Sequence, residues 1–188
     1  MPEKPERRWL KHATPHTDLR EFVDRADKAG ELLHARGVHW DLEMGALAQA
    51  ISHKRNEVRA VLFDEIPDYP KGFRVLCGGT NSSRRVALAL GFPEPRSPLD
   101  AVRAYRNRMK EHEPIPPRVV KDGPVLENVQ RDLEVDLCKF PVPRVHEEDG
   151  GRYLGTDDIV VMLDPEQEWV NAATYRNMVH SKNHTGLW

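Results

Sequence analysis

Apolar residues recur at helical spacing in the segment that precedes Gly30. They are Leu19, Phe22, Val23 and Ala26. Residues three or four positions apart share one face of a helix, so this pattern predicts a helix with a buried stripe. Thr17 or Asp18 can cap it, and Asp18 followed by Glu21 resembles a capping box. Gly30 is typical of a helix end, because glycine readily adopts the left-handed backbone found there.

Amphipathic segments then alternate with short apolar runs as far as residue 112. The continuous apolar runs predict strands at 31–35, 60–66 and 73–78. The amphipathic segments predict helices at 41–54, 78–91 (after a glycine loop) and 97–112. In the first of these helices the inward residues are expected to be Leu42, Leu47 and Ile51. The alternation predicts an N-terminal α/β domain over 17–115, preceded by a flexible arm over 1–16.

The pattern changes at Pro114, where three prolines within PIPPRVV predict a connector. Short β-type segments follow, namely GPVLENV, PVPRV, YLGTDDIVVML and EWVNAATYR. Asp164, Pro165 and Gln167 favour a hairpin turn between the last two. Residues 116–188 are therefore predicted to be the opening strands of a β domain.

The amino-acid composition argues against nucleic-acid binding and membrane association. The 188 residues include 28 basic and 30 acidic side chains, a balance that gives no reason to expect nucleic acid or a membrane surface as partner. The N-terminus lacks the apolar segment of a signal peptide, and no apolar run is long enough to span a membrane. A cytoplasmic protein is expected, with Cys77 and Cys138 as reduced core thiols.

Three motifs invite a binding role, and each has a simpler structural interpretation. The loop Gly78–Ser83 could cradle phosphate at a helix start, but helix capping by Asn81 or Ser82 explains the same residues. His146 and the acids of HEEDGG could bind a metal, although the two glycines favour a solvated turn. His180 and His184 have zinc-like spacing, yet SKNHTG is turn-like and the rings need not share a face.

Asn171 and Arg176 lie five residues apart in a predicted strand. An odd separation puts two side chains on opposite faces unless a bulge intervenes. Spacing alone therefore leaves open whether the two residues form a site, or whether Arg176 is a surface cation and Asn171 a turn residue.

The stretches DGGRYLGTDDIVVMLDP (149–165) and WVNAATYRNMVHSKNHTGLW (169–188) resemble the UbiD family of reversible decarboxylases, which use prenylated FMN. The family pattern pairs D-G-G-x-Y…T with a later N-x-x-x-x-R and a K-N/H-x-x-G turn, in this order. The resemblance spans the chain from about Asp18. It implies an α+β fold in which the N-terminal α/β domain precedes the opening strands of an incomplete, flavin-reductase-like split β-barrel.

The resemblance also implies roles for individual residues. Arg176 would be the catalytic arginine of a Glu-Arg-Glu network, offering a planar fork to a carboxylate. Asn171 would ligate Mn²⁺ or Mg²⁺ that bridges to the cofactor phosphate, with K⁺ as a further ion. Thr156 would contact the cofactor. The strand passing the flavin would be formed by Ala172, Ala173, Thr174 and Tyr175.

The implied activity is the non-oxidative, reversible decarboxylation of an aromatic or α,β-unsaturated carboxylic acid, with CO₂ as product or co-substrate. A flavin prenyltransferase would supply the cofactor, and the full-length protein would be a homo-oligomer. The family's His and Glu metal ligands and both Glu partners of the arginine lie beyond the K-N/H-x-x-G turn, after Trp188. The chain is therefore expected to be a fragment or truncated member, inactive when isolated. Two alternatives stay open: a non-catalytic small subunit that pairs with a separate chain, and a flavin-binding oxidoreductase module.

Overall fold

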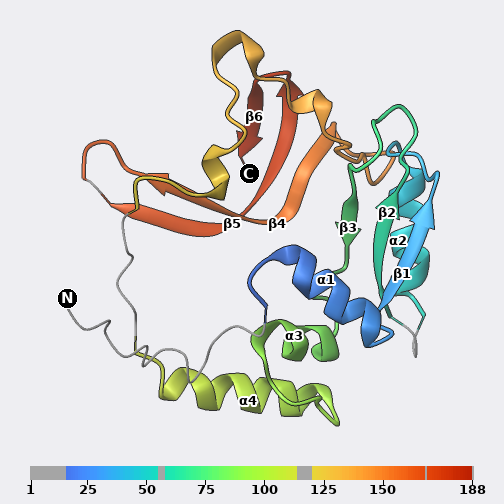
Figure 1. Ribbon diagram of the computed structural model, residues 1–188, viewed down its shortest axis with the longest axis vertical. Helices are drawn as coiled ribbons and strands as arrows, with labels where there is room; N and C mark the ends of the chain where they lie inside the picture. Colours follow the sequence, from blue (N-terminus) through green and yellow to red (C-terminus); the bar gives the residue numbers. More distant parts are fainter. Residues whose placement is uncertain (1–15, 55–57, 114–119, 168, 188) are drawn as a thin grey trace. The chain divides into compact units, whose positions relative to one another are not determined.

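The computed structural model describes residues 16–54, 58–113, 120–167 and 169–187 (Figure 1). Contacts between residues divide the chain into two compact units. The first comprises Met1–His34, Ile51–Leu62 and Leu76–Pro116, and the second comprises Ala35–Ala50, Phe63–Val75 and Pro117–Trp188. The predicted domain boundary between 115 and 116 stays a prediction. The predicted arm, apart from His16, and most of the predicted connector lie outside the described residues.

The first unit contains the helices α1 (Leu19–Lys28), α3 (Ser83–Leu90) and α4 (Pro98–Lys110). The side chain of Asp18 caps α1 by accepting the N–H of Glu21. The Glu21 carboxylate reaches back to Thr17, whose N–H and hydroxyl donate over 2.8 and 2.9 Å, and these bonds hold the pKa of Glu21 below its usual value. Phe22, Val23 and Ala26 are buried as predicted. The prediction was wrong for Leu19, which is 63% exposed in the first turn.

The strands β1 (Leu32–Arg36), β2 (Ala60–Asp64) and β3 (Val75–Cys77) form one sheet in the order β1-β2-β3. Side chains of α1 pack with β1 and β2 in a core cluster of Phe22, Val23, Leu32, Ala60 and Leu62. The helix α2 (Glu43–Ser52) follows β1. Its most buried residue is Met44, at 1% exposure, which the sequence pattern did not single out. Of the residues predicted to point inward, Ile51 is buried, whereas Leu42 and Leu47 are half-buried.

In the second unit, two segments predicted as strands have other structures. Residues of GPVLENV form a 3₁₀ turn, Pro124–Leu126, because Pro124 fits the first position of a helical turn and donates no ladder hydrogen bond. Two further 3₁₀ turns follow at Asp132–Glu134 and Leu137–Lys139. PVPRV contributes only one parallel bridge, between Arg144 and Asp41. Its prolines lack the N–H groups that a longer ladder needs.

The predicted hairpin is confirmed. The strands β4 (Arg152–Leu163) and β5 (Val170–Ser181) pair antiparallel, and β6 (His184–Leu187) pairs with β5 (Figure 1). Asp164 organises the turn through Oδ1, which accepts the N–H groups of Glu166 and Gln167 at 2.8 Å. The fold is α+β as predicted, and the described strands of this second sheet do not close a barrel.

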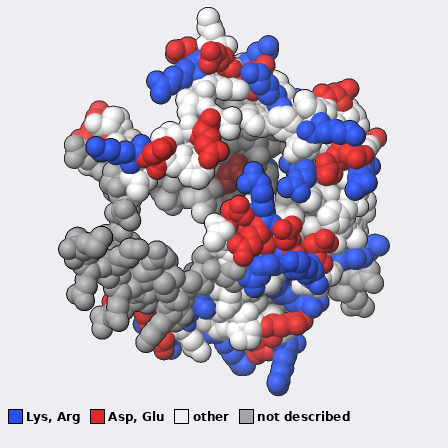
Figure 2. Space-filling model, in the orientation of Figure 1, with Lys and Arg blue, Asp and Glu red and all other residues white. Residues whose placement is uncertain are grey.

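The structure places neither cysteine in the buried core, since Cys77 is half-buried and Cys138 is exposed. Both thiols are free. Burial raises the pKa of the Cys77 thiol, whereas Cys138 is exposed and not a core residue, because it lies in a 3₁₀ turn. Basic and acidic side chains interleave over the face drawn in Figure 2. None of the described helices has the length and apolar character needed to cross a membrane.

Candidate functional site

The strand β5 carries most of the predicted site residues, and from Val170 to Asn177 its positions alternate between exposed and half-buried. Asn171, Ala173 and Tyr175 are half-buried on one face. The predicted site residues Ala172, Thr174 and Arg176 are exposed on the other face. Successive side chains of a strand point to opposite faces, so the structure does not bring Asn171 and Arg176 together on one side of the sheet.

Asn171 is held by a contact along its own face. Its Nδ2 donates a 2.8 Å hydrogen bond to Tyr175 Oη. This hydrogen bond uses only the amide nitrogen of Asn171. The Oδ1 atom, which could ligate a hard cation, takes no part in it. The amide is therefore oriented by Tyr175.

Arg176 lies opposite an irregularity in β4. Gly155 pairs with Asn177 and Asp158 pairs with Tyr175, so two β4 positions, 156 and 157, share the place across from Arg176. Such a bulge re-aims the side chains around it. Thr156 and Arg176, both predicted site residues, are thereby neighbours across the strand pair.

The exposed face that carries Arg176 continues as an apolar surface. Ile159 pairs with Thr174 and Val161 pairs with Ala172, and directly opposed residues share a face. The exposed fractions of Ile159 and Val161 are 72% and 66%. An apolar strand face with an arginine at its end suits an aromatic group with an anionic substituent.

The edge of β5 is open beside the same residues. In the part of the chain that the structure describes, β6 pairs with β5 only between Asn177 and Ser181. The stretch from Val170 to Arg176 therefore has β4 on one side alone. A group lying along this edge can meet backbone N–H and C=O groups and side chains from both faces, including Asn171 and Arg176.

No cluster of three or more His, Cys, Asp or Glu side chains suited to a metal is present among the described residues. His180 lies in β5 and His184 in β6, on either side of a tight turn. His184 Nδ1 contacts Ser181 Oγ at 2.9 Å. Asp149 Oδ2 accepts the N–H groups of Val145 and His146, so HEEDGG is the predicted turn.

The glycine loop before α3 is organised from within. Ser82 caps the helix by accepting the N–H of Arg85, which confirms the capping interpretation. The Arg85 side chain is fully buried and donates to Glu31, Val58 O and Gly78 O over 2.9, 2.7 and 3.0 Å. It also binds the Asn81 side chain. Burial lowers the pKa of Arg85, and the Glu31 charge opposes this effect.

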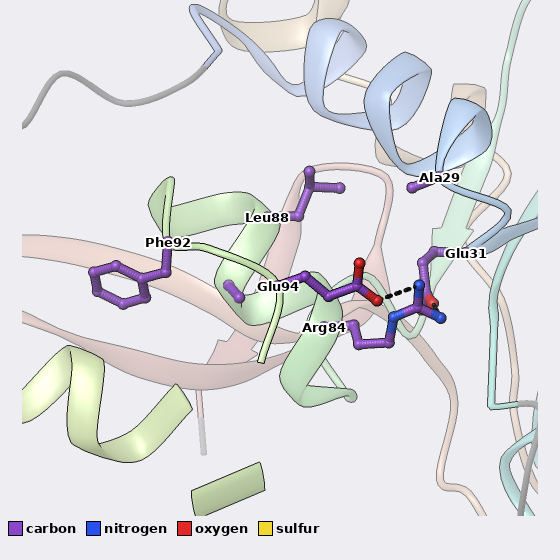
Figure 3. Close-up of a pocket in the computed structure, with 7 residues that line it drawn as sticks. Ala29, Glu31, Arg84, Leu88, Phe92 and Glu94 are labelled. Atoms are coloured by element: carbon purple, nitrogen blue, oxygen red, sulfur yellow. Dashed lines mark ion pairs between the residues drawn. The ribbon is translucent and has the colours of Figure 1, made fainter. Parts of the chain in front are cut away.

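A small cavity of about 100 Å³ lies beside α3 in the first unit. Figure 3 shows its lining residues, with Arg84 between two carboxylates. Arg84 Nη1 lies 2.6 Å from Glu31 and Nη2 lies 2.7 Å from Glu94. Because both ends of the guanidinium are already paired, the cavity offers no free charge to an anion.

Sequence reasoning missed two arginines that organise their surroundings, Arg85 and Arg152. Arg152 donates to Val142 O and Tyr69 Oη, each over 2.6 Å. Neither has a local signal, because an arginine in an amphipathic helix or beside glycines is typical of a solvated surface. Each also has a side-chain partner far away in the sequence, Glu31 for Arg85 and Tyr69 for Arg152, at separations of 54 and 83 residues.

Two family models match the chain. The 3-octaprenyl-4-hydroxybenzoate carboxy-lyase N-terminal domain matches residues 23–105. The Rift-related domain of the same carboxy-lyase matches residues 118–188. Together they include all the predicted site residues.

Several curated relatives are named as decarboxylases. Pyrrole-2-carboxylic acid decarboxylase of Pseudomonas aeruginosa is 39% identical over 88% of this chain and 34% of its own length. Ferulic acid decarboxylase 1 of Candida dubliniensis is 32% identical over 92% of this chain and 36% of its own length. The chain thus spans about a third of the length of these relatives.

Solved structures of a decarboxylase and of a UbiD-class enzyme are similar to this chain. Vanillic acid decarboxylase of Sedimentibacter hydroxybenzoicus in closed form has a TM-score of 0.81 and 31% identity, covering 93% of this chain and 37% of that one. A UbiD-class enzyme of Pelotomaculum thermopropionicum in complex with FMN has a TM-score of 0.72 and 26% identity, covering 90% of this chain and 36% of that one. With both of its matched regions belonging to one family of carboxy-lyases, the chain belongs to the UbiD family, as a partial member.

Proposed function

We propose that this chain supplies part of the active site for the non-oxidative, reversible decarboxylation of an aromatic or α,β-unsaturated carboxylic acid with prenylated FMN. The observation that carries the proposal is the position of Arg176, at the end of an exposed apolar sheet face and across from the β4 bulge. The two curated relatives described above are named as decarboxylases of pyrrole-2-carboxylic and ferulic acids, and another relative, of Sedimentibacter hydroxybenzoicus, is named as a phenolic acid decarboxylase. An evolved dimeric form of the UbiD-class enzyme of Pelotomaculum thermopropionicum, 24% identical to this chain, was solved in complex with prenylated FMN (prFMN).

The residues present fit a planar cofactor at the open edge of β5. When bound, prenylated FMN supplies the electron sink that decarboxylation requires. Arg176 holds the substrate carboxylate through two parallel N–H···O bonds, which restricts rotation of the bond that breaks. Ile159 and Val161 provide apolar surface next to it and exclude water from the carboxylate.

Metal binding needs residues beyond those described. Asn171 provides one neutral oxygen, whereas Mn²⁺ and Mg²⁺ take several oxygen ligands with charge among them. Asn171 would thus hold one coordination position of the divalent ion, and the other ligands would come from elsewhere. K⁺ would be a second, separate ion of the same site. The proposed homo-oligomer and the supply of cofactor by a flavin prenyltransferase belong to the same complete assembly.

A graft tests the proposal. Residues 1–188 replace the matched third of the Pseudomonas aeruginosa relative, and the graft is produced together with a flavin prenyltransferase. We expect CO₂ release from pyrrole-2-carboxylic acid, and its loss when Arg176→Met is introduced. A folded graft that carries the cofactor but releases no CO₂ would contradict the proposal.

Supplying residues 1–188 as a separate chain, beside the remaining two thirds of the relative, tests the alternative of a small subunit. Activity regained in trans would favour subunit pairing. Activity found only in the covalent graft would favour the interpretation that residues 1–188 are a segment of a longer enzyme. The 188-residue chain alone is the negative control.

A further inference from the structure

Arg152, the first residue of β4, joins three stretches of the second unit. Its Nε donates to Val142 O over 2.6 Å, and its Nη2 donates to Tyr69 Oη over 2.6 Å and to Phe140 O over 3.3 Å. The carbonyl acceptors belong to the segment that leads into β4, and Tyr69 lies far away in the sequence. One guanidinium thus ties the entrance of β4 to the 63–75 stretch.

The flat face of the same guanidinium packs against an aromatic ring. Arg152 Cζ lies 3.9 Å from the centre of the Trp40 ring, a cation–π distance. The Tyr69 ring lies 6.0 Å away. A third stretch of the unit, 35–50, is thereby held by this side chain.

Neighbouring contacts make the same junction rigid. Arg144 Nε binds Asp41 Oδ1 at 2.7 Å. Leu42 N–H donates to Arg144 O over 2.9 Å, and Arg144 N–H donates to Trp40 O over 3.1 Å. The segment before β4 is therefore fixed on the 35–50 stretch by both backbone and side chains.

The strand that Arg152 begins loses its regular register immediately afterwards. Arg152 pairs with Val179 and Tyr153 with Met178, and register shifts then follow on both sides of Gly155. Gly155 lies close to the Asp158 carboxylate, which would have to turn aside if position 155 carried a Cβ. Since a shift of register moves side chains to the other face, the place of Thr156 depends on where β4 is anchored.

We propose that Arg152 is a positioning residue: by anchoring the entrance of β4 to Trp40 and Tyr69, it sets the bulge that places Thr156 opposite Arg176. The importance of this position for catalysis rests on the proposed function. Arg152 occupies the open position of the D-G-G-x-Y pattern. It acts through the strand and touches no reacting atom.

Lysine cannot replace this arginine. The planar guanidinium donates along its edge to two carbonyls and a phenol while stacking on Trp40. An ammonium group has no flat face and donates from a single atom. Arg152→Lys keeps the charge yet loses the anchor, which distinguishes positioning from a simple requirement for charge.

The first measurement is residue-resolved backbone hydrogen exchange on the 188-residue chain at low micromolar concentration. In Arg152→Lys and Arg152→Met we expect exchange from Tyr153 to Asp158 to be about tenfold faster, with α1 and α3 changed less than about twofold. Tyr69→Phe removes one acceptor and keeps the ring, so it should give a smaller change in the same place. If Arg152→Met does not fold, Tyr69→Phe takes its place as the test of the anchor. Arg103→Met, at an exposed position of α4, is the matched control.

The second measurement reports on the site itself. Arg176 Cζ lies 5.8 Å from the Tyr153 ring, so the Nε–Hε resonance of Arg176 should move in Arg152→Lys and stay in place in Arg103→Met. Unchanged exchange from Tyr153 to Asp158, or equal loss of protection in both units, would overturn the inference. Neither measurement needs flavin or substrate. An inactive graft would therefore contradict the proposed function and leave this inference standing.

Discussion

Asn171 and Arg176 lie on opposite faces of β5, five positions apart on one strand. The shared point of access to both is the edge of β5 that β6 leaves open before Asn177. If a cofactor lies along this edge, the two side chains serve different ends of it. Substitutions at the two positions should then have separable effects.

Arg176→Lys in the active graft should keep the cofactor and lose turnover. An ammonium cannot hold a carboxylate in bidentate fashion, and misplacement by about 1 Å costs on the order of 100-fold in rate. CO₂ release is measured with cofactor content checked by absorbance. Near-normal turnover in the Lys variant would exclude the catalytic role of Arg176.

Asn171→Ala should instead weaken metal and cofactor retention, by about 10- to 100-fold in metal affinity. The fold should lose only the hydrogen bond to Tyr175, about 1 kcal/mol. Bound Mn²⁺ and thermal melting are measured side by side in the graft. Asn177→Ala, on the same half-buried face, is the control. A collapsed melting temperature with metal retained would indicate a purely structural Asn171.

The local patterns of the chain predicted most helices and the β4–β5 hairpin, because caps, turns and apolar periodicity are encoded within a few residues. Asp18, Ser82 and Asp164 all make the local bonds that their positions suggested. The failures had two causes, one local and one in the pairing of strands. GPVLENV has β-type residues, but Pro124 starts a 3₁₀ turn. The bulge opposite Arg176 depends on pairing between strands, which spacing along one strand does not contain.

Glu31→Gln should destabilise the first unit by about 3 kcal/mol, since removing one partner leaves a buried charge uncompensated. The side chain of Arg85 is 0% exposed and that of Glu31 is 9% exposed. Glu94→Gln is the matched control, because Glu94 also binds Arg84 but its side chain is 70% exposed, and should cost less than about 1 kcal/mol. Denaturant unfolding monitors both. Equal effects would show that burial does not decide the strength of these pairs.

Gly45→Ala should destabilise the second unit, although alanine is the better helix former. A Cβ at position 45 would collide with the carbonyl oxygen of Val145, so α2 would have to move away, at a cost of about 1–3 kcal/mol. Gly123→Ala is the control, because a Cβ at position 123 would meet nothing within 4 Å among the described residues. Thermal melting of the two variants is compared. A melting temperature of Gly45→Ala equal to or above that of the parent would contradict the close approach.

The isolated 188-residue chain should self-associate as its concentration rises. On β4, Ile159, Val161 and Leu163 alternate on one face with exposed fractions of 72%, 66% and 63%, and the run from Ile159 to Leu163 carries no charge. An apolar strand with an open edge is a template for pairing with another chain. Val161→Lys places a charge in the middle of this face and should keep the chain monomeric to higher concentration. Thr185→Lys, an exposed position on β6, adds the same charge away from the face and should not. Light scattering over a concentration series measures the size of each variant, and a parent chain that stays monomeric throughout would show that the exposed β4 face does not drive association.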